Sequence, residues 1–78
     1  DMFLEIITPD KKVFNGEVTS ATFPGVLGSF QILENHAPIV STLSAGKIKY
    51  VVGGKEEFVD VLGGVVEVSK NKAIVLAE

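Results

Sequence analysis

Residues 46–62 read GKIKYVVGGKEEFVDVL, and this stretch decides the fold class because it describes two strands and the turn between them. Apolar side chains in its first half alternate with lysines, at Ile48, Tyr50 and Val52. Alternation with a period of two is typical of a strand that buries one face. Gly53-Gly54 then supplies a turn signal, because glycine adopts positive φ without steric penalty. Residues 55–62 continue beyond this turn as a second predicted strand.

Short segments rich in β-branched and aromatic residues recur along the rest of the chain. The further expected strands are residues 2–8, 17–23, 65–69 and 73–77. The expected turns are Pro9-Asp10, Asn15-Gly16, Pro24-Gly25 and Lys70-Asn71-Lys72. Asn-Gly is the strongest short-range hairpin signal among them, and the asparagine of the last turn tolerates positive φ. Gly63-Gly64 fits either another tight turn or a corner where a strand crosses between sheets.

These elements predict one all-β domain without substantial helix. No window of ten or more residues has helical periodicity, and glycine and proline recur too often to permit one. Short strands separated by turn signals about every 8–12 residues favour an antiparallel sandwich or barrel. A chain of 78 residues has room for a single domain, residues 1–78.

The composition narrows the classes of partner. Hydrophobic residues make up 46% of the chain and there is no cysteine, so stability must come from a dense apolar core, with apolar surface left for a partner to bury. Ten acidic residues outnumber seven lysines, and arginine is absent. This balance argues against nucleic-acid binding. The apolar runs are shorter than the roughly 20 residues of a membrane span, so we expect no direct membrane insertion.

The single histidine lies in residues 28–43, which read GSFQILENHAPIVSTL. Catalysis would need His36 beside a serine or threonine hydroxyl, with a third group to orient the ring. One histidine among common serines is weak support for that arrangement. The interpretation we favour is a loop histidine that bonds to nearby backbone. We expect no catalytic residue.

Other polar clusters do not form a recognisable site. A metal site would need more histidines or carboxylates at ligand spacing, so we expect none. Glu56, Glu57 and Asp60 fit a solvated strand face. Pro24–Gly28 lacks the Gly-Lys-Ser/Thr ending of a phosphate loop, so we expect no bound nucleotide and no cofactor.

Lys70 and Lys72 leave one alternative open, a small all-β carrier or adaptor domain like the lipoyl and biotinyl domains. Such domains resemble this chain in size, acidity and a lysine at a hairpin tip. The neighbours here are Ser69, Asn71 and Ala73, whereas a carrier lysine normally stands next to aspartate or between methionines. We therefore favour a solubilising turn.

Three motifs carry a family resemblance: LEIITPDKKVFNGEV from residue 4, GSFQILENHAP from residue 28 and GGVVEVSKNKAIVLAE from residue 63. In order and spacing they resemble the N-terminal domain of the epsilon subunit of F-type ATP synthases. The resemblance implies a flattened β-sandwich and a non-catalytic central-stalk subunit that binds the gamma subunit and the c-ring. It also implies a peripheral location on the cytoplasmic face of a bacterial plasma membrane.

The resemblance further implies where the partners bind. The expected interface residues are Ser29, Phe30, Glu34, Asn35, His36, Ala37, Pro38 and Ser41. Three places depart from the family pattern, and at one of them Gln31 replaces a usual glycine. Ser29 replaces a common acidic residue that points to the polar loops of the c-ring. Glu34-Asn35 replaces a common Pro-Gly, and asparagine is the residue best able to keep the left-handed backbone that glycine allows there.

Many members of this family continue into a C-terminal helical hairpin that inhibits ATP hydrolysis. The 78 residues stop at Glu78, where that hairpin would begin. We therefore expect this polypeptide to lack inhibition by an inserted helix.

Overall fold

A computed structural model describes residues 2–78 and contains nine strands in this range. Their bounds are β1 (Met2–Ile7), β2 (Lys12–Val18), β3 (Ser20–Gly25), β4 (Gly28–Leu33), β5 (Ile39–Leu43), β6 (Gly46–Val52), β7 (Lys55–Val61), β8 (Gly64–Ser69) and β9 (Lys72–Ala77). No residue in this range is helical, which confirms the all-β prediction. It follows that no described helix could cross a membrane.

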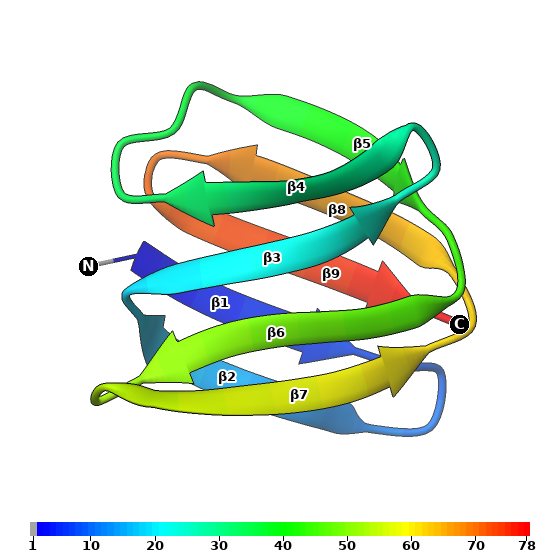
Figure 1. Cartoon of the computed structure of the whole chain (residues 1–78). Coiled ribbons are helices and arrows are strands. Elements are labelled where there is room, and N and C mark those ends of the chain that lie inside the picture. Colours follow the sequence, from blue (N-terminus) through cyan, green and yellow to red (C-terminus); the bar gives the residue numbers. More distant parts are fainter. Residues whose placement is uncertain (1) are drawn as a thin grey trace.

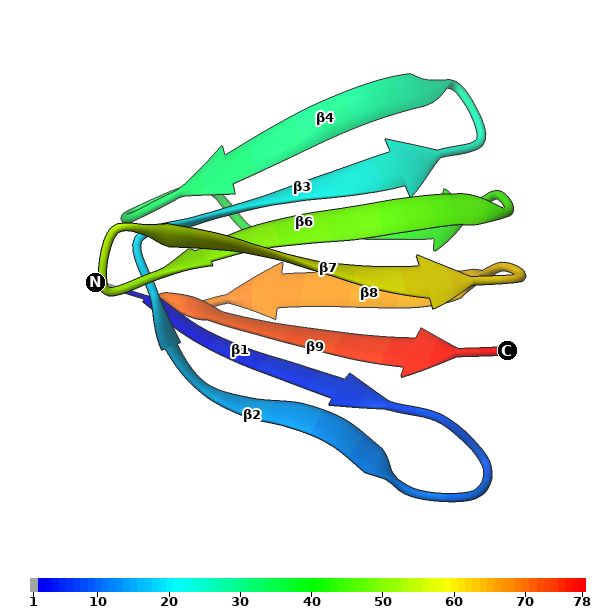
Figure 2. The same ribbon diagram turned by 60° about the horizontal axis from the view of Figure 1, so that its bottom comes forward.

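The strands form one sheet that curls into two layers. Its order is β2-β1-β9-β8-β5-β3-β6-β7, with β4 paired to β3. Figures 1 and 2 show β4, β3, β6 and β7 as a front layer over a back layer of β5, β8, β9, β1 and β2. The layers are joined between β3 and β5 by the single pair Gly25 and Leu43. With extents of 26 × 23 × 17 Å, the result is the flattened sandwich that the resemblance implied.

One ladder differs from the antiparallel prediction. β1 and β9 are parallel, with Leu4 opposite Ala73 and Ile6 opposite Val75. Parallel neighbours cannot be joined by a tight turn, and here they are the first and last of the nine strands. Local turn signals therefore contain no information about this pairing.

The core is a slab of apolar side chains between the layers. The buried hydrophobic residues are Met2, Leu4, Ile6, Val18, Ala21, Phe23, Ile32, Leu43, Ile48, Tyr50, Val61, Val66, Val68, Ala73, Val75 and Ala77. In β1, β8 and β9 they alternate with more exposed residues, as the two-residue period of a strand requires. No polar or charged residue in the described range is buried.

Aromatic contacts strengthen this slab at two places. The rings of Phe14 on β2 and Tyr50 on β6 lie 4.4 Å apart and connect the two layers. Phe23 and Phe30, opposite each other on β3 and β4, lie 5.5 Å apart within the front layer. Burial raises the pKa of the Tyr50 hydroxyl, and the nearby charge of Glu57 raises it further. Tyr50 therefore stays neutral at physiological pH.

The predicted hairpin at Asn15-Gly16 is wrong. Gly16 lies within β2 opposite Leu4, and positive φ does not occur at either residue. The chain turns earlier, where the Thr8 amide donates to the Lys11 carbonyl at 2.9 Å. A Cβ on Gly16 would lie 3.2 Å from the Phe14 ring, so this glycine makes room for an aromatic side chain.

The predicted stop at Pro24-Gly25 is also displaced. β3 continues through Gly25, and the chain turns at Val26 and Leu27. Proline is tolerated here because it lies near the end of its strand.

The later turns are confirmed. Gly53 and Gly54 have φ of 57° and 79°, and Lys70 and Asn71 have φ of 53° and 60° between β8 and β9. Gly63-Gly64 connects β7 in the front layer to β8 in the back layer. Of the two interpretations left open, the corner between layers is the correct one.

Gly64 should be the least replaceable glycine of these turns. Its φ is 140°, and an added Cβ would clash with the Leu76 carbonyl oxygen on β9. We expect Gly64→Ala to lower the free energy of unfolding by about 3 kcal/mol or more, measured by urea denaturation. The control is Gly53→Ala, which has positive φ but open space around it and should cost about 1–2 kcal/mol. Equal losses would show that the contact with β9 is unimportant.

Candidate partner-binding surface

The loop that carries His36 joins β4 to β5 and consists of residues 34–38, all of them exposed. The His36 amide donates to the Leu33 carbonyl at 3.3 Å and closes a turn. Asn35, the third residue of this turn, has a φ of 66°. The expectation that asparagine keeps the left-handed backbone is therefore confirmed. Pro38 fixes its own φ and favours an extended Ala37, which stiffens the exit of the loop.

A second turn holds this loop in place. The Asn35 amide donates to Oδ1 of Asn71 at 2.5 Å, and Nδ2 of Asn71 donates to Oδ1 of Asn35 at 3.2 Å. Asn71 belongs to the β8–β9 turn, 36 residues away in sequence. The loop on one layer edge is thereby attached to the hairpin at the centre of the back layer.

The His36 ring bonds to its own loop. Nδ1 lies 2.7 Å from the Ala37 carbonyl oxygen, and the ring is exposed. A carbonyl can only accept, so Nδ1 carries the proton of this bond and the neutral ring leaves Nε2 as an acceptor. The described partner of the ring is thus backbone, as favoured from the sequence, and not a serine or threonine hydroxyl.

The structure does not bring all predicted interface residues to one place. Glu34–Pro38 lie at one end of the sandwich, whereas Ser29 is near the β3–β4 turn at the opposite end of β4. Phe30 is half-buried against Phe23. Ser41 is half-buried in β5, where its hydroxyl donates to the Thr42 carbonyl at 3.4 Å. One small contact could not cover these positions.

The outside of the back layer carries an apolar surface whose residues the sequence did not predict. We call it the outer apolar face; it consists of Ile7, Val40, Val65, Ile74 and Leu76. Val65, Leu76 and Ile7 are consecutive neighbours across β8, β9 and β1, and Val40 and Ile74 flank Glu67 in the next row. A hollow lined by Ile7, Thr8, Pro9, Leu76 and Ala77 continues it. Such contiguous exposed apolar surface is typical of a protein–protein interface.

One signal in the sequence indicated this face. Residues 73–77 read AIVLA, apolar at every position. A strand without polar alternation is typically covered on both sides. In the described chain only one side of β9 is covered, because Leu76 is 58% exposed.

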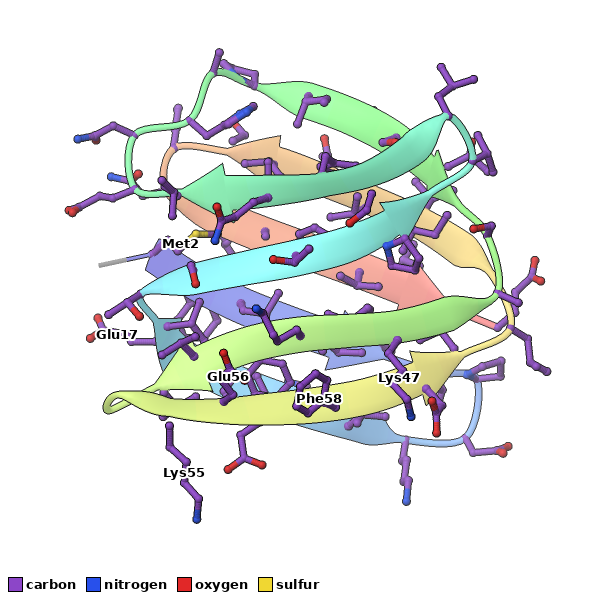
Figure 3. All side chains as sticks on the ribbon, viewed as in Figure 1. Met2, Glu17, Lys47, Lys55, Glu56 and Phe58 are labelled. Carbon is purple, nitrogen blue, oxygen red and sulfur yellow. The ribbon has the colours of Figure 1, made fainter. Side chains whose placement is uncertain are left out.

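The outside of the front layer is different in character. Lys47 pairs with Asp60 at 2.8 Å and Lys49 with Glu56 at 3.6 Å. Figure 3 shows Lys47, Glu56 and the exposed Phe58 along β6 and β7. Exposed ion pairs contribute little stability, but they keep this layer hydrated. The outside of the front layer therefore combines ion pairs with the exposed Phe58, whereas the outside of the back layer carries the longer row of apolar side chains.

Further exposed apolar side chains lie at the β3–β4 end of the sandwich, which also carries Ser29. Val26 and Leu27 form the β3–β4 turn, and the Leu27 side chain is fully exposed. Ser29 pairs with Pro24 directly behind this turn.

Among residues 2–78, no cluster of His, Cys, Asp and Glu could hold a metal ion.

Comparison with known proteins identifies the family. The family described as "ATP synthase, Delta/Epsilon chain, beta-sandwich domain" matches residues 1–78. The chain belongs to this family. An ATP synthase epsilon chain of Chlorobium limicola is 47% identical over 76 residues, covering 96% of this chain and 86% of the relative. The epsilon chain of Nitratidesulfovibrio vulgaris is 47% identical over 77 residues, covering 99% of this chain and 58% of the relative.

Two solved structures contain a chain with the same fold. A chain in the mitochondrial ATP synthase of Euglena gracilis, solved as OSCP/F1/c-ring, matches with a TM-score of 0.90 at 22% identity, covering 97% of this chain and 49% of that chain. A chain in the central stalk/c-ring of the Tetrahymena thermophila mitochondrial ATP synthase matches with a TM-score of 0.83 at 20% identity, covering 97% and 62%.

The hydrogen bond to Ala37 predicts the tautomer of the His36 ring in this delta/epsilon domain. At a pH where the ring is neutral, we expect the proton on Nδ1, because only an N–H can donate to the carbonyl. Long-range ¹H–¹⁵N correlation spectra distinguish the two ring nitrogens, and a chain with one histidine gives an unambiguous signal. A dominant Nε2–H form would contradict the described ring orientation.

Proposed function

We propose that this chain is a non-catalytic rotor subunit of a proton-translocating F-type ATP synthase, in which residues 1–78 form the domain that links the gamma subunit to the c-ring. The family and the relatives named epsilon chain support this assignment. The observation that carries it is the outer apolar face, because a free monomer would leave these strands uncovered. The catalytic sites of the complex belong to other subunits.

The proposed gamma-binding surface combines the outer apolar face with the His36 loop. Val40 follows this loop on β5, and the β8–β9 turn attached to the loop continues into the strands that carry Val65 and Ile74. An apolar centre with a polar rim is typical of stable interfaces. The rim here includes Nε2 of His36 as an acceptor and the ion pair between Glu5 and Lys12 at 2.9 Å.

The proposed c-ring contact lies at the opposite end, around Ser29 and the β3–β4 turn. A serine hydroxyl donates and accepts hydrogen bonds but carries no charge. The contact is then a polar and apolar one, made by Ser29 with Val26 and Leu27, and not the ionic one common in the family. Together the interface comprises Ser29, Phe30, Glu34, Asn35, His36, Ala37, Pro38 and Ser41, in addition to the outer apolar face.

In this proposal the chain is peripheral to the membrane and faces the cytoplasm of a bacterial cell, held there by its partners. The bacterial relatives support this location. The carrier alternative lacks comparable support, because the family match covers the β8–β9 turn with its lysines.

Leu76→Asp tests the outer apolar face. We expect at least tenfold weaker binding to the gamma subunit in calorimetric titration, since a carboxylate would be buried in an apolar contact. Phe58→Asp is the matched control, because Phe58 is 54% exposed on the other layer and Leu76 is 58% exposed. If both variants bind equally well, the gamma subunit does not cover the back layer.

His36→Ala tests the loop. We expect the melting temperature of the variant to stay within a few degrees of that of the wild-type chain, because a surface substitution typically changes the free energy of unfolding by about 0.5 kcal/mol or less. Binding to the gamma subunit or the c-ring should weaken several-fold, and more strongly for His36→Asp. Ready unfolding of the variants would make His36 a structural residue. Normal folding and binding would place the interface elsewhere.

A further inference from the structure

Two asparagines with left-handed backbone face each other across the His36 end of the sandwich. Asn35 has a φ of 66° and Asn71 a φ of 60°. Their two hydrogen bonds run in opposite directions, so that each residue both donates and accepts. Non-glycine residues pay a steric cost at positive φ, and the reciprocal bonds offset this cost at both turns.

The pair connects the loop to the core of the back layer. Every residue from 34 to 38 is exposed, so the loop gains little from the core. Segments with few buried contacts open locally at low free energy. The bond from the Asn35 amide to Asn71 ties the loop backbone to β8 and β9, whose Val66, Val68, Ala73 and Val75 are buried. A hairpin anchored in the core of the back layer thereby orients the loop.

We propose that Asn71 is a positioning residue for partner binding: its amide holds the His36 loop in the geometry that the gamma subunit recognises. This inference rests on the proposed function for the identity of the partner, but not for the clamp itself. Asn71 acts through Asn35, and the loop meets the partner already ordered. Ordering before association lowers the entropic cost of binding.

Asn71→Gly is the decisive variant, because glycine keeps the left-handed turn and removes only the amide. Asn71→Asp is the conservative rescue, since a carboxylate still accepts from the Asn35 amide and aspartate tolerates positive φ. Asn15→Ala is the control; its side chain is exposed and makes no described hydrogen bond within residues 2–78.

Two quantities are measured on the 78-residue chain. Amide hydrogen exchange of Asn35 and His36, followed by NMR, reports the clamp without any partner. Calorimetric titration with the gamma subunit reports binding. Asn71→Gly removes both hydrogen bonds of the pair. We expect it to speed exchange at Asn35 and to weaken binding, each by at least about two- to tenfold, which is the effect of losing one such bond. Asn71→Asp should restore both quantities in part, because it keeps the acceptor for the Asn35 amide but loses the donor to Oδ1 of Asn35. Asn15→Ala should change neither.

The outcomes separate the two proposals. Unchanged exchange in Asn71→Gly overturns the clamp. Faster exchange with unchanged gamma binding overturns the positioning role. If the wild-type chain does not bind the gamma subunit, the proposed function is wrong, and so is the positioning role. The exchange data still decide whether the hydrogen bonds between Asn35 and Asn71 hold the loop.

Discussion

The whole structure depends on one thin slab of apolar side chains between two layers of a single curled sheet. No cysteine is present, and none of the described polar or charged residues is buried, so no buried polar side chain selects the register. Register is instead fixed by burial, because a shift of one residue would turn the core face of a strand to water. Ala21, Ala73 and Ala77 in the same slab as Phe23 and Tyr50 indicate that side-chain size is matched locally. Such close packing also limits the size of substitutions that the core can accept.

The sequence predicted the later strands and turns correctly and the earlier ones poorly. The expected strand 17–23 is divided between β2 and β3, and neither β4 nor β5 was predicted. Gly53-Gly54 and Lys70-Asn71 form the expected turns, because glycine and asparagine tolerate positive φ. The positive φ of Lys70 follows from its place in the turn before Asn71 and not from its residue type. Asn15-Gly16 has the same local preference, yet it lies within β2 because Leu4 and the Phe14 ring require an extended strand there. The parallel pairing of β1 and β9 and the separation of Ser29 from His36 depend on tertiary topology. The apolar run of residues 73–77 is apolar on both sides of the strand, but only the strand order shows which neighbours share the outer side.

The two outer faces of the domain differ in chemical character. Ion pairs between Lys47 and Asp60 and between Lys49 and Glu56 hydrate the front layer, and apolar side chains leave the back layer to a partner. The two ends also differ, with an asparagine-held polar loop at one and the exposed Val26 and Leu27 at the other. Because its two outer faces and its two ends all differ, the domain favours one orientation when it binds between two larger proteins. Specificity of that kind comes from the placement of polar and apolar groups and does not require a large interface.

The central position of β9 has a consequence for biosynthesis. β9 lies between β1 and β8, so the back layer stays divided until the last of the nine strands is available. During translation, β1 and β2 can pair early, but β1 then presents an unpaired edge for as long as the strands up to β9 are being added. Open strand edges are sites of unwanted association. Folding that waits for contacts between the first and last strands is also slow. The nascent chain therefore passes through an aggregation-prone interval that ends only when β9 leaves the ribosome.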